Sequence, residues 1–129
     1  MGEQEANGST QQTNSVLVDG SHRYTDVKCL PVIGPGGAHH NYEIVKKKDS
    51  EVLLRLSFQN GPIKESGVNG VMDENLIAIV IDRLKGFQSG KYASPYNHGA
   101  LEHLEWALDE LKERTIQRIK RGVEGTHEV

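Results

Sequence analysis

The sequence predicts an α+β fold, in which a small antiparallel β-sheet in the N-terminal half is followed by a C-terminal helical hairpin with one long helix. Residues 52–58 alternate apolar and polar side chains, the period typical of a half-buried strand. Residues 76–84 repeat apolar side chains every three or four positions, as an amphipathic helix does. Residues 94–121 open with Ser-Pro and carry regularly spaced leucines, which indicates a second, longer helix.

The length of 129 residues supports one domain. Residues 1–15 offer almost nothing to bury and predict a disordered lead-in, which leaves residues 16–129 as a single α+β domain. Cys29 is the only cysteine, which excludes an internal disulfide and is typical of a reducing cytosol. Because we find neither a secretory leader nor an apolar run long enough to span a bilayer, we expect a cytoplasmic protein with no membrane partner.

The strands are expected in the first half. Residues 16–45 are rich in Val, Ile and Tyr and are interrupted by glycine-containing turns, so they predict one or two short strands and a tight loop. Residues 41–46 and 52–58 predict a hairpin that is closed by the polar residues 47–50. The Gly-Pro pair at 61–62 ends the second strand.

The first long helix is expected to begin at Asp73, which is a favourable N-cap residue. Met72 and Ile77 are spaced as a hydrophobic staple around it. Gly86 or Gly90 is expected to end the helix.

The second helix is expected to start with Ser94 as N-cap and Pro95 at the first helical position, and to stop at Gly122. Its apolar seam follows a three-four spacing: Leu101, Leu104, Leu108, Leu111 and Thr115. From Pro95 to Arg121 the helix is about 40 Å long, whereas a compact domain of this size is about 35 Å across. The helix should therefore either overhang the rest of the chain or pack on another subunit, and we expect a hairpin that oligomerises.

The charge distribution points to a small anionic partner. A net charge of −3 argues against binding to polymeric nucleic acid. Residues 112–121 nevertheless hold five basic groups and one acidic group. Such a local basic patch favours a compact anion, although one or two of the cations can simply complement the helix dipole.

Arg114, Arg118 and Arg121 lie at i, i+4 and i+7 and therefore share one stripe of the second helix. Guanidinium groups suit bidentate contact with phosphate. The alternative is a solvated basic face whose arginines pair with neighbouring glutamates: Glu110, Glu113 or Glu124.

Candidate base-contacting residues lie around the turn of the hairpin. Phe87 follows Gly86 at the end of the first helix, where an aromatic ring can stack on a base or can close the core of the hairpin. Asn97 lies in the connector, with a carboxamide that can read a base edge or make a local turn bond.

No catalytic or metal-binding pattern is visible in the sequence. His39 and His40 are adjacent and point to opposite sides, and Cys29 has no activating neighbour. Residues 34–39 lack the glycine of a dinucleotide fingerprint and the lysine of a P-loop. We therefore expect a protein that is not an enzyme and that binds no metal or cofactor.

From Phe58 onward the sequence resembles the phage Thoeris anti-defence signal sponges of the first type described. The stretches that carry the resemblance are residues 58–90, the hairpin 93–119, which also resembles a phage anti-CBASS sponge family, and the tail 121–127. The motifs FQNGPIK, GVNGV and RGVEGTH are the distinctive ones.

The resemblance implies a non-enzymatic binder, acting in the host cytoplasm, of the cyclic ADP-ribose isomers that bacterial TIR-domain defence proteins make. Residues 16–129 would then form the ligand-binding domain. It further implies self-assembly into dimers and hexamers. Some family members also hold cyclic di- or trinucleotides at a separate pocket. The alternative function is a structural or partner-binding helical oligomer without a small-molecule ligand.

The resemblance also implies roles for individual residues. Phe87 matches the aromatic that stacks on adenine, and Asn97 matches a residue that contacts base or ribose. Four further residues match phosphate-contacting arginines or lie in the matching tail: Arg114, Arg118, Arg121 and Thr126.

One stretch departs from the family pattern. Many relatives carry Cys-Arg-Glu before the asparagine, where this chain has Ser94-Pro95-Tyr96 and so lacks those two charges.

The candidate residues lie towards opposite ends of the second helix, so we expect them to meet only between antiparallel helices of two subunits.

Overall fold

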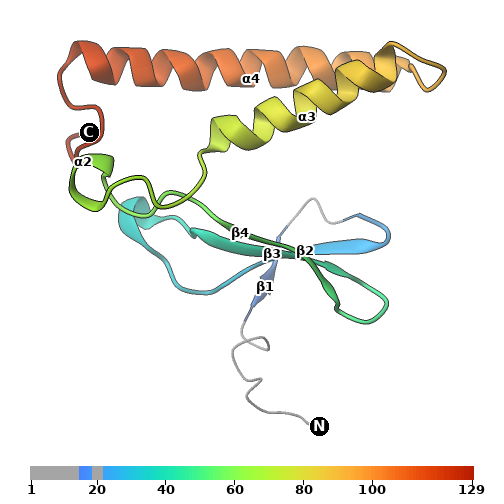
Figure 1. The fold of residues 1–129 in the computed structure, drawn as a ribbon, viewed down its shortest axis with the longest axis horizontal. Coiled ribbons are helices and arrows are strands. Elements are labelled where there is room, and N and C mark those ends of the chain that lie inside the picture. The colour runs from blue at the N-terminus through green and yellow to red at the C-terminus, as the bar shows by residue number, and fades with distance from the viewer. Residues whose placement is uncertain (1–14, 19–21) are drawn as a thin grey trace, which may run out of the picture. The chain divides into compact units, whose positions relative to one another are not determined.

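The computed structural model describes residues 15–18 and 22–129, in which strands precede helices as the sequence predicts (Figure 1). Residues 1–14 of the predicted lead-in lie outside the described residues. The chain divides into two compact units, Met1–Gly61 and Pro62–Val129. The first holds the sheet and the second holds the long helices.

The sheet has four strands in the order β1-β2-β3-β4, and every neighbouring pair is antiparallel. They are β1 (Val16–Leu17), β2 (Thr25–Cys29), β3 (Asn41–Lys46) and β4 (Val52–Ser57). The predicted hairpin is confirmed to within one residue. A short 3₁₀ turn, η1 (Pro35–Gly37), lies in the predicted tight loop between β2 and β3.

One face of the sheet is apolar and the other carries charge. The apolar face is formed by three strands: Val27, Cys29, Tyr42, Ile44, Leu54 and Leu56. On the opposite face Arg55 Nε donates to Glu43 Oε2 at 3.0 Å. An irregularity next to Val45 leaves Leu53 out of register, and side chains beyond it change face.

The turn between β3 and β4 is held by an exposed ion pair of 2.8 Å between Lys46 Nζ and Glu51 Oε1. The hydrogen bond to Glu51 raises the pKa of Lys46, and the negative charges of Glu51 and Asp49 add to the effect.

The second unit contains a short helix and two long ones: α2 (Ile63–Ser66), α3 (Asp73–Gln88) and α4 (Pro95–Lys120). The expected N-cap at Asp73 is wrong by one residue, because Met72 occupies that position. Asn75 Oδ1 accepts a hydrogen bond of 2.9 Å from the Met72 backbone N–H, which anchors the entry to the helix. α3 continues through Gly86 and ends just before Gly90.

The boundaries expected for the longest helix are confirmed. Ser94 is the N-cap of α4, and its Oγ accepts a 3.0 Å hydrogen bond from the Asn97 backbone N–H. Pro95 occupies the first helical position. Gly122 adopts φ +73°, the left-handed conformation that ends a helix at low cost only in glycine.

α3 and α4 form the predicted helical hairpin. They are closest near the connector and diverge towards the start of α3 (Figure 1). With 16 and 26 residues, they are about 24 and 39 Å long at the usual rise of about 1.5 Å per residue. A stretch of α4 therefore extends beyond its partner. None of the helices in the described residues is long and apolar enough to cross a membrane.

Few apolar side chains are deeply buried. In the described residues only Cys29, Val45 and Ile81 are, at 5%, 3% and 7% exposure. Large apolar side chains of the hairpin remain exposed: Ile79, Val80, Trp106, Ile116 and Ile119. Exposed apolar surface of this extent is unusual for a monomeric protein.

Candidate ligand-binding site

The connector between α3 and α4 is fixed by Gln88, the last residue of α3. Its side-chain amide bonds both backbone groups of Ser94: Oε1 accepts from the Ser94 N–H at 2.8 Å, and Nε2 donates to the Ser94 carbonyl at 3.1 Å. Ser89 Oγ also donates to the Gly86 carbonyl at 2.7 Å. The turn is therefore a defined structure that holds the flanking residues in place. Sequence reasoning did not identify Gln88, because its partner lies across a loop.

Phe87 lies in the last turn of α3, and its side chain is 37% exposed. The ring is therefore partly accessible in the single chain. The guanidinium carbon of Arg83, one turn earlier, lies 5.0 Å from the centre of the Phe87 ring. The ring thus combines accessible aromatic surface with a cation beside it.

Asn97 lies in the first turn of α4, on the other side of the connector. Its Nδ2 makes a long 3.4 Å hydrogen bond to the Tyr92 carbonyl. The local turn bond expected as an alternative is therefore present, although it is weak at this length. Phe87 and Asn97 flank the same connector, so the structure brings these two predicted residues to one end of the hairpin.

At the far end of α4 the chain folds back on the helix. Arg118 Nη2 donates to the carbonyls of Val123 and Thr126, at 3.0 and 3.2 Å. Thr126 Oγ1 donates to the same Val123 carbonyl. Arg118 therefore holds the tail in place. The sequence did not predict this role, because it depends on the reversal at Gly122. Both contacts use Nη2 alone, so Nε and Nη1 remain able to donate to a phosphate.

The tail is also tied to the short helix α2. The Lys64 backbone N–H donates to the Gly125 carbonyl at 3.0 Å, and His127 Nδ1 lies 2.8 Å from Glu65 Oε2. Arg121 Nη1 donates to the carbonyl of Val129. Arg121 and Thr126, two of the predicted site residues, thus form hydrogen bonds within the tail itself. These contacts give the tail a defined conformation.

Arg114 lies on α4 one turn before Arg118 and is exposed. Among the described residues, no carboxylate lies within ion-pair distance of either arginine. Glu113, one of the glutamates considered as a partner, instead accepts a hydrogen bond from Gln117. In the described part of the chain, Arg114 and Arg118 therefore do not form the ion pairs with glutamates that the alternative expected.

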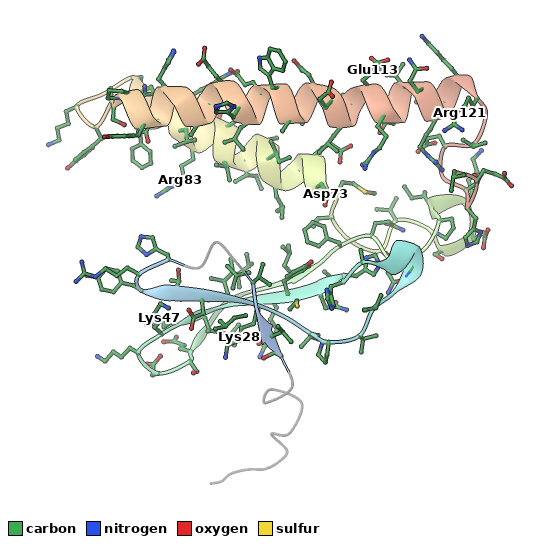
Figure 2. All side chains as sticks on the ribbon, turned by 180° about the vertical axis from the view of Figure 1, so that it is seen from behind. Lys28, Lys47, Asp73, Arg83, Glu113 and Arg121 are labelled. Atoms are coloured by element: carbon green, nitrogen blue, oxygen red, sulfur yellow. The ribbon has the colours of Figure 1, made fainter. Side chains whose placement is uncertain are left out.

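The two groups of candidate residues lie far apart within one chain. Between Asn97 and Arg114 the helix rises about 25 Å, at about 1.5 Å per residue. Small-molecule pockets hold about 300–1,000 Å³, which is only about 7–10 Å across. One chain therefore does not bring Phe87 and Arg114 into one pocket. Figure 2 shows Arg83, which lies one turn before Phe87, and Arg121, which follows α4, towards opposite ends of the hairpin.

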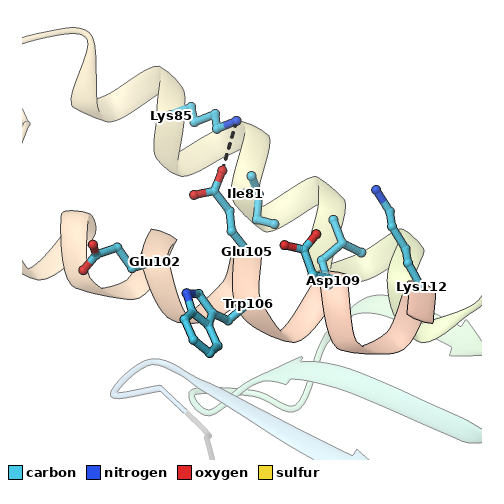
Figure 3. A pocket seen from close by; sticks show the side chains of 8 residues that line it. Ile81, Lys85, Glu102, Glu105, Trp106, Asp109 and Lys112 are labelled. Carbon is cyan, nitrogen blue, oxygen red and sulfur yellow. Dashed lines mark ion pairs between the residues drawn. The ribbon is translucent and has the colours of Figure 1, made fainter. Parts of the chain in front are cut away.

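A shallow groove of about 540 Å³ lies between α3 and α4, and none of the six predicted residues lines it (Figure 3). Its wall carries three carboxylates, of which Glu105 pairs with Lys85 at 3.3 Å, and the exposed ring of Trp106. Three carboxylates against two lysines make a poor site for a pyrophosphate. In the described residues, no three His, Cys, Asp or Glu side chains gather as metal ligands do.

The hairpin is similar to a domain of known proteins. Residues 51–115 match the model of the Acb2/Tad1 hairpin domain, which spans β4, α2, α3 and most of α4. The chain is also similar to Thoeris anti-defense 1 of Bacillus phage SBSphiJ7, with 45% identity over 95 residues. The match covers 74% of this chain and 66% of that relative, slightly less than two thirds of its length.

Proposed function

The chain belongs to the Acb2/Tad1 hairpin family, and from this premise we propose that it blocks Thoeris defence by sequestering a cyclic ADP-ribose isomer. The protein acts in the cytoplasm of the infected bacterium. Each captured molecule is withheld from the defence effector that it would otherwise activate. The 45% identity to a Thoeris anti-defence protein supports this assignment.

The observation that carries the proposal is the division of the candidate residues between the two ends of α4. A cyclic ADP-ribose isomer offers a base, sugars and a pyrophosphate. Phe87 and Asn97 suit the base and sugar, and Arg114 and Arg118 suit the pyrophosphate. An antiparallel pair of copies would bring the connector of one beside the tail of the other. The site is then shared, and each dimer holds two.

Two features support a two-fold pair of copies. The exposed apolar side chains of the hairpin supply area to bury. Two-fold pairing is also the commonest symmetry of soluble oligomers. Hexamers would arise by further association of dimers.

We propose that the protein binds the nucleotide without cleaving or modifying it. The groups that contact the ligand in this scheme are an aromatic ring, a carboxamide and guanidinium groups, and guanidinium stays protonated at physiological pH. They bind and orient a ligand, but they provide no general base or nucleophile for its cleavage.

Cyclic di- or trinucleotides are a proposed second ligand class, held at a separate pocket. In the segment where relatives carry Cys-Arg-Glu, Ser94 and Pro95 here serve as helix cap and first helical residue. Two separate pockets predict that a cyclic trinucleotide and a cyclic ADP-ribose isomer bind without competing.

The decisive experiment is calorimetry of the full chain with cyclic ADP-ribose isomers, followed by heat release and mass spectrometry of the ligand. We expect tight binding and recovery of the ligand unchanged. A chemically altered ligand would identify an enzyme instead.

The second candidate is a structural or partner-binding oligomer without a small-molecule ligand. The exposed apolar side chains, with Trp106 at 76% exposure, favour it, since they account for assembly alone. It predicts assembly in solution with no heat of binding for any of these nucleotides.

A further inference from the structure

We propose that Arg83 is a ligand-positioning residue, which stacks on Phe87 and supplies the positive charge that an anionic nucleotide needs at this end of the hairpin. The inference deepens the proposed function and rests on it. It gives a role to a residue that neither the sequence patterns nor the stripe of arginines on α4 pointed to.

The geometry is that of a cation stacked on a ring. Arg83 and Phe87 are four residues apart and therefore neighbours on one face of α3. The Arg83 guanidinium carbon lies 5.0 Å from the ring centre, within the usual range for a cation–π contact. A guanidinium on one face of the ring limits the rotamers of Phe87 and leaves the opposite face for a base.

The electrostatics of the helix end favour a cation here. Phe87 lies in the last turn of α3, where the helix dipole gives a negative potential that disfavours phosphate. Lys85 also lies in this turn, but it pairs with Glu105 at 3.3 Å (Figure 3). Among the described residues, no carboxylate lies within ion-pair distance of Arg83. Its charge is therefore available to an incoming ligand.

Binding of a cyclic ADP-ribose isomer by Arg83→Gln tests the proposal, with Lys85→Gln as the matched control. We expect Arg83→Gln to weaken binding about three- to thirty-fold, the range of a cation–π contact between exposed and desolvated settings. The salt dependence of binding should fall as well, because a charge is lost. Lys85→Gln removes the same charge but should lower the affinity much less, since Lys85 pairs with Glu105 and the contact with the Phe87 ring is made by Arg83.

Two further variants separate positioning from general stability. Arg83→Lys should restore the salt dependence but only part of the affinity, because an ammonium group lacks the planar stacking surface. In a Phe87→Ala background, Arg83→Gln should cost less than it does in the unchanged protein, because the two residues act together. Equal losses in both backgrounds, or unchanged affinity of Arg83→Gln, would overturn the inference.

A measurement without ligand keeps this test separate from that of the proposed function. The chain has only two phenylalanines, so ring-labelled phenylalanine gives two resolvable sets of NMR signals. Arg83→Gln should shift the Phe87 ring signals and leave those of Phe58 unchanged. Unmoved Phe87 signals contradict the stacking even if the unchanged protein binds no cyclic ADP-ribose isomer, whereas that failure of binding alone overturns the proposed function.

Discussion

Phe87 has two interpretations, which variants of this one residue can separate. A phenylalanine at a helix end is consistent with a core position or with a stacking platform. At 37% exposure, and with a cation beside its ring, it has surface to offer a base. The same exposure limits what the residue contributes to folding.

We therefore predict that Phe87→Ala weakens binding of the cyclic ADP-ribose isomer about ten- to a hundred-fold, since stacking contributes about 1–3 kcal/mol per base. The free energy of unfolding should fall by less than the roughly 3–5 kcal/mol of a core truncation. Calorimetry and denaturant unfolding on the same variant measure both. A large stability loss with unchanged affinity would return Phe87 to the core.

The two arginines of α4 should respond differently to removal. Arg114→Ala should weaken binding and reduce its salt dependence, with stability changed by at most about 0.5 kcal/mol. Arg118→Ala should also cost about 1–2 kcal/mol of stability, because the carbonyls of Val123 and Thr126 lose a charged donor. Urea unfolding distinguishes the pair. If Arg118→Ala leaves stability unchanged, the tail is held by its other contacts.

The sequence predicted the elements whose ends are marked by neighbouring residues. It did not predict the short helix or the contacts between residues far apart in the chain. The Ser94-Pro95 start and the Gly122 stop of α4 rest on cap chemistry written in neighbouring residues. The start of α3 was misplaced by one residue, because Asn75 bonds the Met72 backbone instead of Asp73 acting as the cap.

The short helix α2 escaped prediction because four residues show no periodicity, and its link to the tail joins Lys64 to Gly125. The role of Arg118 in holding the tail was missed because its partners lie in a segment that folds back beyond the helix. Spacing along a helix identified which arginines share a stripe, but it carries no information on a segment that folds back after the helix ends.

The cap of α4 gives a prediction at this scale. Ser94→Ala should cost about 1 kcal/mol of stability, since the Asn97 N–H loses its side-chain acceptor. Ser94→Thr should keep most of it, because threonine retains the hydroxyl. Thermal unfolding followed by circular dichroism compares them. Equal destabilisation by both would mean that the side-chain bond is not what matters.

At the scale of the whole molecule, the exposed apolar surface and the distance between the two groups of candidate residues both support the proposed dimer. Trp106 is the only tryptophan in the chain, and it is largely exposed in the single subunit. Whether it becomes buried on assembly is directly observable.

We predict that dilution shifts the Trp106 emission to longer wavelength at the concentration where light scattering reports dissociation. Light scattering should show a dimer or larger assembly at low micromolar concentration. A monomer there would remove the shared site. An emission maximum that stays constant through dissociation would place Trp106 outside the interface.

A mixture of two variants with weakened binding tests the shared site most directly. Phe87→Ala and Arg114→Ala each impair both sites of their own dimer. When the two are mixed and refolded together, about a quarter of all sites should combine an intact Phe87 with an intact Arg114, as expected for random two-fold pairing. Calorimetry of the mixture should recover that fraction of full-affinity sites. No recovery would mean that both residues act within one chain.

The length of α4 has a consequence for when the protein can work. The proposed site, which two chains would build, would exist only in the assembled form, so its abundance would follow mass action. At concentrations below the dimer dissociation constant, the number of such sites would grow with the square of the chain concentration. A ligand that binds the dimer and not the separate chains would in turn stabilise the assembly that holds it. Capture would therefore set in abruptly as synthesis proceeds, and a rising level of signal would itself recruit more chains into the binding form.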